Sequence, residues 1–277
     1  MLLQFKILLH ALKRNGLLQL FFYLSNLDAV RFIEYSKTVE YLDKEDAQII
    51  LDLGTGYSVL PSFLKENLKS TYVTLDLSLN ACKYQADCNI ADMHQILSDM
   101  RHLQIKSLSI SVVIAISSIE HVGKMEHVDD ALIFKEIYRV LKQGGVAIVS
   151  LPYSYKCPKI VRMAHSYVLL SLLHKLRVLW LMFLGKHFYY FIEQTTTDSI
   201  MKYYDDNEIT DILSNGLSLE RRYYYGKKIL SRFFRCIPLG WFVLKDLLFG
   251  LTLSKIDDAL GNTKDASGVV LKIRKLR

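Results

Sequence analysis

The sequence predicts an α/β fold built on a doubly wound, mostly parallel sheet. Short apolar runs that fit buried strands alternate with longer amphipathic stretches that fit helices. The first of these runs, Gln48–Leu51, leads into an acid and then a turn with two glycines. A later run, Ser111–Ile116, is apolar enough to be buried on both faces, as parallel strands are.

Seven strands and three well-defined helices are expected along the chain. The strands are Gln48–Leu51, Thr71–Leu75, Ala86–Ile90, Ser111–Ile116, Val146–Ser150, Leu217–Tyr225 and Gly268–Arg274. The helices are Val30–Leu42, Ser58–Leu68 and one that starts at Asp129 and ends at Gly144 and Gly145. Pro61 is compatible with the second helix because a proline is tolerated in a first helical turn.

Length and composition narrow the class of protein. The 277 residues can bury a large core, and they fit one large domain with insertions. Apolar residues make up 51%, yet no stretch reaches the roughly 18 to 20 uncharged residues that span a bilayer, so no transmembrane helix is expected. Residues 1–24 lack a signal-peptide cleavage site. The four cysteines have no metal-ligand spacing, which predicts reduced thiols, a cytoplasmic location and no metal site.

The turn after the first strand reads Leu-Asp-Leu-Gly-Thr-Gly-Tyr-Ser over residues 51–58. Gly54 and Gly56 have no Cβ, so a ligand can approach the main chain closely there. Asp52 is placed to hold backbone amides or a polar edge of that ligand. The motif resembles the first motif of class I S-adenosylmethionine-dependent methyltransferases, although Ser58 stands where the third glycine of that family often lies.

Two later segments are similar to the same family. Glu120-His121-Val122 follows the fourth strand, and Glu136–Gly145 reads EIYRVLKQGG. The resemblance implies a Rossmann-like sheet of seven strands, the seventh antiparallel. It does not cover residues 1–27, which we expect to form an apolar, basic N-terminal helix before a methyltransferase domain (28–277). Nor does it cover the long insertions at about 153–197 and 227–263, which we expect to form a helical cap over the acceptor site.

The resemblance also implies a site for S-adenosylmethionine. Its cofactor-binding residues are Asp52, Gly54, Thr55, Gly56, Asp76, Leu77, Asp92, Met93 and Ser117. Asp76 follows Gly54 by 22 residues, the spacing at which an acid on the second strand reaches ribose hydroxyls. Asp92 is expected to accept from the adenine amine, and Met93 to pack on the ring.

His121 is the candidate catalytic residue. A sulfonium is already an activated methyl donor, so aligning the acceptor and excluding water supply most of the rate, roughly 7 to 11 kcal/mol. A hydroxyl acceptor also needs a base, and imidazole titrates near neutral pH. The alternative is that His121 only shapes the pocket or binds backbone, with Glu120 orienting it or touching the cofactor.

Positive charge gathers in three apolar segments. Residues 1–27, 153–192 and 221–255 together carry +16, whereas the rest of the chain carries −9. Basic helices with aromatic faces fit an anionic membrane surface, so the acceptor is expected to be a small molecule, a glycan or a lipid-linked, amphiphilic molecule at the periphery of a membrane. Equally, these faces could pack on the sheet and leave the lysines solvated.

Two other classes of protein stay open. An NAD(P)-dependent reductase could use the same turn, but Val59 replaces the third glycine and Pro158 interrupts a tyrosine–lysine pair at Tyr155 and Lys159. A non-catalytic, membrane-associated binding protein is the second alternative. Nucleic acid is not expected as a partner, because the aromatic residues cluster with leucines. The sequence predicts neither the acceptor atom nor the oligomeric state.

Overall fold

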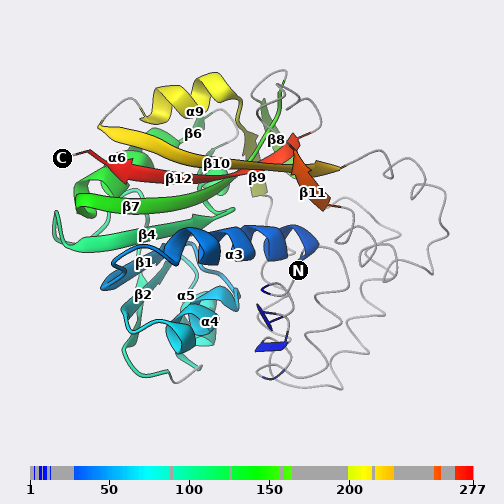
Figure 1. The fold of residues 1–277 in the computed structure, drawn as a ribbon. Helices are drawn as coiled ribbons and strands as arrows, with labels where there is room; N and C mark the ends of the chain where they lie inside the picture. Colours follow the sequence, from blue (N-terminus) through cyan, green and yellow to red (C-terminus); the bar gives the residue numbers. More distant parts are fainter. Residues whose placement is uncertain are drawn as a thin grey trace.

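A mixed sheet of eight strands forms the centre of the fold in the computed structural model (Figure 1). Its order is β11-β10-β12-β7-β4-β1-β2-β3. The structure describes Leu3, Lys6, Ile7, Leu9, His10 and Lys13 and the ranges 28–87, 90–124, 127–155, 159–163, 199–213, 216–227, 253–256 and 266–276.

The sheet is parallel over β3, β2, β1, β4 and β7, and β12 runs antiparallel to both of its neighbours, β7 and β10. The predicted Rossmann-like sheet with an antiparallel seventh strand is therefore confirmed, and β11 adds an eighth strand at the edge. The strands are β1 Ile49–Leu53, β2 Thr71–Asp76, β3 Met93–Leu97, β4 Ile110–Ile116, β7 Leu141–Pro152, β10 Leu217–Lys227, β11 Leu253–Ile256 and β12 Ala266–Lys275.

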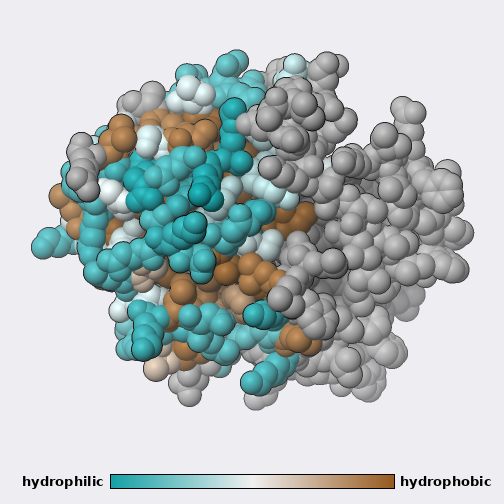
Figure 2. Space-filling model, viewed as in Figure 1, coloured by the Kyte–Doolittle hydropathy of each residue, from teal (hydrophilic) through white to brown (hydrophobic). Residues whose placement is uncertain are grey.

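Helices pack on both faces of the sheet because successive strand residues point to opposite sides. Leu51 and Leu53 of β1 share a core with α6 and α9, whereas Ile50 shares the other core with α3 and α4. The helices are α3 Asp28–Leu42, α4 Leu60–Asn67, α5 Leu79–Ala86, α6 Asp130–Val140, α9 Asp206–Leu213 and a single turn, η1, Ile119–His121. Figure 2 shows the α3 side, where hydrophilic residues cover much of the described surface and hydrophobic ones form smaller patches.

The predicted third strand, Ala86–Ile90, is wrong. Ala86 is the last residue of α5, whose N-terminus is capped by Ser78, because the Ser78 hydroxyl accepts from the Ala81 amide at 3.3 Å. The strand that pairs with β2 begins later, at Met93. The helix after Asp129 also ends earlier than predicted, since Leu141 already pairs with Ile110 in the sheet.

Two short strand pairs lie outside the main sheet. β5 (Gly123–Lys124) pairs with β6 (His127–Val128), and β8 (Lys159–Met163) pairs antiparallel with β9 (Ser199–Tyr203). The helical caps and the basic, membrane-facing segments expected from the sequence fall mainly on 164–198 and 228–252, outside the described residues. Within the described part of the chain, no helix has the length and apolar character needed to cross a bilayer.

Candidate functional site

The turn after β1 packs directly against the segment after β4. Gly54 has a φ of +68°, and a Cβ placed on it would lie 2.6 Å from the Ser118 Cβ. The Gly54 amide donates to the Leu75 carbonyl at 2.7 Å, and the Ser118 hydroxyl donates to the Leu53 carbonyl at 2.9 Å. A glycine is therefore required at position 54 for both conformation and space.

Asp76, at the end of β2, organises the same turn. One oxygen of its carboxylate accepts from the Gly56 amide at 2.8 Å, and the other accepts from the Ser78 amide at 2.8 Å. An ionised carboxylate offers about four lone-pair sites, so capacity for further donors remains. Leu77 follows with a relative exposure of 71%, which leaves an apolar side chain uncovered beside Asp76.

Thr55 lies between the two turn glycines and is buried, yet its hydroxyl oxygen has no hydrogen-bond partner among the residues that the structure describes. Buried hydroxyls are nearly always paired, so an unpaired one beside a glycine turn indicates a place where a ligand supplies the partner. Together with Gly54, Gly56 and Asp76, this orphaned hydroxyl fits a nucleoside at the carboxyl edge of the sheet, where open α/β folds bind their ligands.

Asp52 lies within β1 and is buried. Burial raises the pKa of its carboxyl to about 7, although the Tyr72 hydroxyl donates to it at 2.7 Å and opposes the rise. Tyr72 comes from β2, and its own pKa is raised well above the ordinary value by burial and by the Asp52 charge. The structure thus joins Asp52 to the neighbouring strand, a partner that the sequence did not indicate.

Asp92 and Met93 do not join this site. Because β3 runs parallel to β2 with Met93 opposite Tyr72, both residues lie at the amino end of the sheet, whereas Asp76 is opposite Leu97 at the carboxyl end. Asp92 is exposed and lies 3.6 Å from the Lys65 amine. The misplaced third strand caused this error: the residues assigned to the end of that strand precede the real one.

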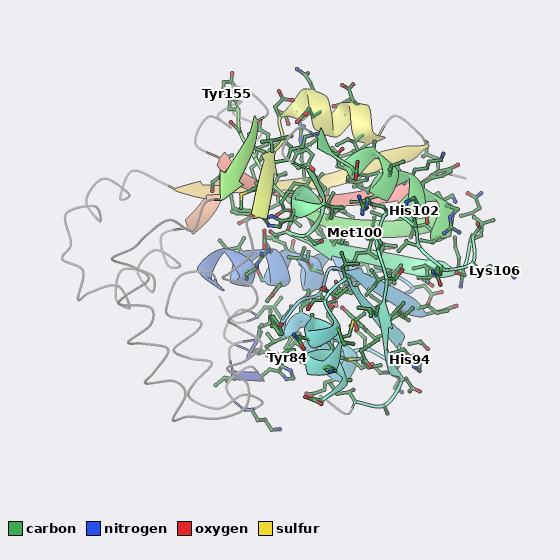
Figure 3. All side chains as sticks on the ribbon, turned by 180° about the vertical axis from the view of Figure 1, so that it is seen from behind. Tyr84, His94, Met100, His102, Lys106 and Tyr155 are labelled. Carbon is green, nitrogen blue, oxygen red and sulfur yellow. The ribbon has the colours of Figure 1, made fainter. Side chains whose placement is uncertain are left out.

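Asp99 and Met100 follow β3 and occupy the place predicted for Asp92 and Met93. Figure 3 labels Met100 beyond the strand and His94 within it. The buried Met100 side chain lies close to Gly54, with its Cε 3.0 Å from a Cβ built there. Arg101 donates to both oxygens of Asp99, and these hydrogen bonds lower the pKa of Asp99, which stays an acceptor.

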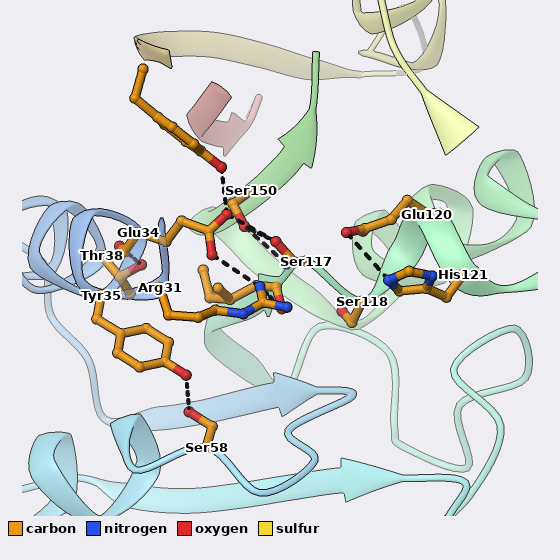
Figure 4. Close-up of polar contacts among 12 residues, drawn as sticks. Arg31, Glu34, Tyr35, Thr38, Ser58, Ser117, Ser118, Glu120, His121 and Ser150 are labelled. Carbon is orange, nitrogen blue, oxygen red and sulfur yellow. Dashed lines mark hydrogen bonds and ion pairs between the residues drawn. The ribbon is translucent and has the colours of Figure 1, made fainter. Parts of the chain in front are cut away.

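Helix α3 contributes a polar network that the sequence did not reveal (Figure 4). The Glu34 carboxylate, fully buried, accepts from the Arg31 guanidinium at 2.9 Å, the Ser117 hydroxyl at 2.8 Å and the Tyr225 hydroxyl at 2.6 Å. Ser117 has a φ of +44°, and its amide donates to the Ser150 hydroxyl at 2.9 Å. Ser117, predicted to bind cofactor, therefore connects β4 and β7 to α3.

Glu120 and His121 lie on η1, directly after β4. The His121 Nε2 atom is 3.8 Å from Glu120 Oε1, and about a third of the His121 side chain is exposed. Glu120 is only 1% exposed; burial raises its pKa to about 8, the Arg31 charge lowers it and the Glu34 charge raises it. Its Oε2 atom is buried without a hydrogen-bond partner.

The glycine turn, the acid after β2 and the sheet order define a nucleoside-binding α/β enzyme domain. Residues 51–149 match the family described as "Methyltransferase domain". Residues 51–149 therefore carry a class I S-adenosylmethionine-dependent methyltransferase domain, as the resemblance implied.

Known proteins similar to this chain share that fold. A "Malonyl-[acyl-carrier protein] O-methyltransferase" of Marinomonas sp. (strain MWYL1) is 29% identical over 122 residues; the match spans 43% of each chain, less than half of that relative. The 1,6-didemethyltoxoflavin-N1-methyltransferase of Burkholderia thailandensis, solved with S-adenosylhomocysteine, is similar over 91% of this chain and 80% of its own, with 9% identity and a TM-score of 0.53.

An S-adenosylmethionine-dependent methyltransferase of Methanosarcina mazei has a TM-score of 0.53 and 12% identity over 87% of this chain and 97% of its own. At these identities the solved structures support the fold and not a particular acceptor.

Proposed function

We propose that this protein transfers a methyl group from S-adenosylmethionine to a small-molecule acceptor, with glycans and lipid-linked or other amphiphilic molecules as the first class to examine. The observation that supports this most is the hydrogen bond from Gly56 to Asp76 beside the unpartnered Thr55 hydroxyl. These groups leave hydrogen-bonding capacity where a nucleoside binds in this fold.

When bound, the donor supplies a methyl group that is already activated by a sulfonium. Asp76 holds ribose hydroxyls, and Leu77 packs on the nucleoside. Asp99 and Met100 take the adenine-binding role that the resemblance implied for Asp92 and Met93. His121, partly exposed beyond the end of β4, takes the proton from a hydroxyl acceptor.

Calorimetry with S-adenosylmethionine, S-adenosylhomocysteine and NADH in parallel tests the cofactor. We expect wild type to bind the first two and not NADH, and Asp76→Ala to weaken both. Binding of NADH alone would support a reductase instead. A folded chain that binds none of the three would support the non-catalytic alternative.

Identifying the methyl acceptor requires separate experiments. The printed name of the Marinomonas relative denotes methylation of a malonyl group on a carrier protein, so carboxylates on acyl chains belong in the acceptor panel. The basic segments read from the sequence suggest a peripheral site on a cytoplasmic membrane face. Sedimentation with anionic and with neutral vesicles at low and high salt tests this: no anionic binding at low salt removes the membrane part and leaves the methyltransferase part intact.

A further inference from the structure

We propose that Glu120 makes the site sensitive to the charge of its ligand: binding of S-adenosylmethionine, a sulfonium, releases a proton from Glu120, whereas binding of S-adenosylhomocysteine, a neutral thioether, does not. This inference rests on the proposed function. It makes Glu120 a residue that discriminates the methyl donor from its product.

Glu120 is anchored close to the cofactor turn. Its single-turn helix η1 is preceded by Ser118, which packs on Gly54 and donates to the Leu53 carbonyl at 2.9 Å. Asp76 flanks the turn on the β2 side and η1 flanks it on the β4 side. A ligand that extends from Asp76 across the turn therefore reaches the surroundings of Glu120.

The carboxyl of Glu120 is buried and incompletely paired. Among the described residues Oε2 has no hydrogen-bond partner, and Oε1 lies 3.8 Å from the His121 Nε2 atom, which pairs with it as an ion only when His121 is protonated. Arg31, the cation that faces Glu120 from α3, pairs with Glu34 at 2.9 Å. Lys202 of β9 pairs with Asp130 at 2.7 Å. Arg31 and Lys202 thus each have a carboxylate partner other than Glu120.

Other titratable groups also lie close to η1. Burial is the main cause of the raised pKa values of Tyr204 and Tyr225, and the Glu120 charge adds to the rise in both. On the elements packed around η1, such groups include Arg31 and Glu34 of α3, Asp130 of α6, Tyr153 after β7, Lys202, Tyr203 and Tyr204 on and after β9, Tyr225 of β10, and His121 itself.

The direction of the coupling follows from these surroundings. Because burial raises the pKa of Glu120 to about 8, about three quarters of the molecules carry the Glu120 proton at pH 7.5. A positive charge brought into a poorly solvated region favours the ionised carboxylate and expels that proton. A neutral ligand of the same shape has no such effect. Affinity for the sulfonium should therefore rise with pH relative to affinity for the thioether.

Calorimetric titration of the full chain at pH 7.5, in phosphate and in Tris, measures protons released on binding. We expect wild type to release roughly half a proton more with S-adenosylmethionine than with S-adenosylhomocysteine. Glu120→Gln should abolish this difference, and the matched neighbour His121→Gln should retain it. Titration of the amino groups of the two ligands is common to wild type and variants, so the comparison isolates Glu120.

If Glu120→Gln fails to fold, the pH dependence of ligand binding to wild type tests the inference. The ratio of the two affinities should change roughly tenfold in favour of S-adenosylmethionine between pH 6 and pH 9. A ratio that does not vary with pH, or a proton difference that survives in Glu120→Gln, overturns the inference and leaves the proposed function standing. Wild type that binds neither ligand overturns the proposed function, and the inference with it.

Discussion

The Gly56 amide donates to the Asp76 carboxylate at 2.8 Å, so the chain's own side chain fixes the turn after β1 to the end of β2. A preformed site of this kind does not spend binding free energy on ordering its own backbone. The same carboxylate is expected to hold the ribose, and its removal therefore affects both the shape of the turn and the ligand.

We expect Asp76→Ala to weaken S-adenosylmethionine binding by about 10- to 100-fold, since hydrogen bonds to a charged group contribute roughly 1.5 to 3 kcal/mol. The matched control is Asp92→Ala, which removes an exposed carboxylate at the opposite end of the sheet. Calorimetry should show wild-type affinity for the control. A large loss in Asp92→Ala would restore the assignment made from the sequence.

Comparing Gly54→Ala with Gly144→Ala separates the cost of an unfavourable backbone conformation from the cost of overpacking. Both glycines have positive φ, +68° and +74°, but a Cβ on Gly144 meets nothing within 4 Å, whereas one on Gly54 meets Ser118 at 2.6 Å. We expect Gly144→Ala to cost about 1 to 2 kcal/mol of unfolding free energy from conformation alone. Gly54→Ala should cost about 1 to 3 kcal/mol more from overpacking, as measured by urea unfolding. Equal losses would contradict the close contact between the turn and Ser118.

Asp52 should make stability fall as pH rises. Burial raises its pKa to about 7, so the folded state keeps a proton that the unfolded state loses near pH 4. Between those values the contribution of Asp52 to the unfolding free energy declines, and above about pH 7 it is constant. Across that pH range, the unfolding free energy of Asp52→Asn should rise relative to that of wild type by up to about 1.4 kcal/mol per pH unit.

Asp99→Asn is the control, because the contribution of Asp99 to stability should change with pH in the direction opposite to that of Asp52. Hydrogen bonds from Arg101 lower the pKa of Asp99, so its contribution is present above about pH 4 and is lost as pH falls further. Urea unfolding at a series of pH values distinguishes the two. A difference between Asp52→Asn and wild type that is constant from pH 5 to 8 would show that Asp52 is ionised throughout.

Removing one partner of the Arg31–Glu34 ion pair should lower the unfolding free energy strongly, whereas replacing both partners with apolar residues should lower it little. Glu34→Gln leaves a largely buried guanidinium without its carboxylate, and we expect a loss of about 3 kcal/mol, at the low end for buried pairs because Arg31 is a quarter exposed. Replacing both, Arg31→Met with Glu34→Leu, should restore most of that stability. A double variant that is less stable than Glu34→Gln would show that Ser117 and Tyr225 depend on the acid itself.

The strands of the sheet's middle were predictable from the sequence, because β1, β4 and the second half of β7 are mainly apolar and mostly buried, and β2 is rich in residues that favour strands. β3 was not. Its residues, Met-His-Gln-Ile-Leu, show mixed burial because the strand lies at the edge of the sheet and pairs only with β2. Pairing with β2 decides where that strand begins, and local propensity does not reveal it.

The glycine turn and Asp76 were predictable because a short, local motif encodes them. The network around Glu34 was not, since its partners Ser117 and Tyr225 lie 83 and 191 residues further along the chain. Nothing in the neighbourhood of Glu34 in the sequence indicates that distant hydroxyls will meet it. The burial of Glu120 depends in the same way on contacts from β9, which the sequence places far from η1.

The position of β12 has a consequence for how the protein is made. β12 is the last strand of the sheet to be synthesised, yet it lies between β7 and β10 and supplies hydrogen bonds to both. While the ribosome is still translating Ala266–Lys275, the nascent chain exposes open strand edges on β7 and β10, which are templates for aggregation. These two edges become paired within the sheet only once β12 lies between them.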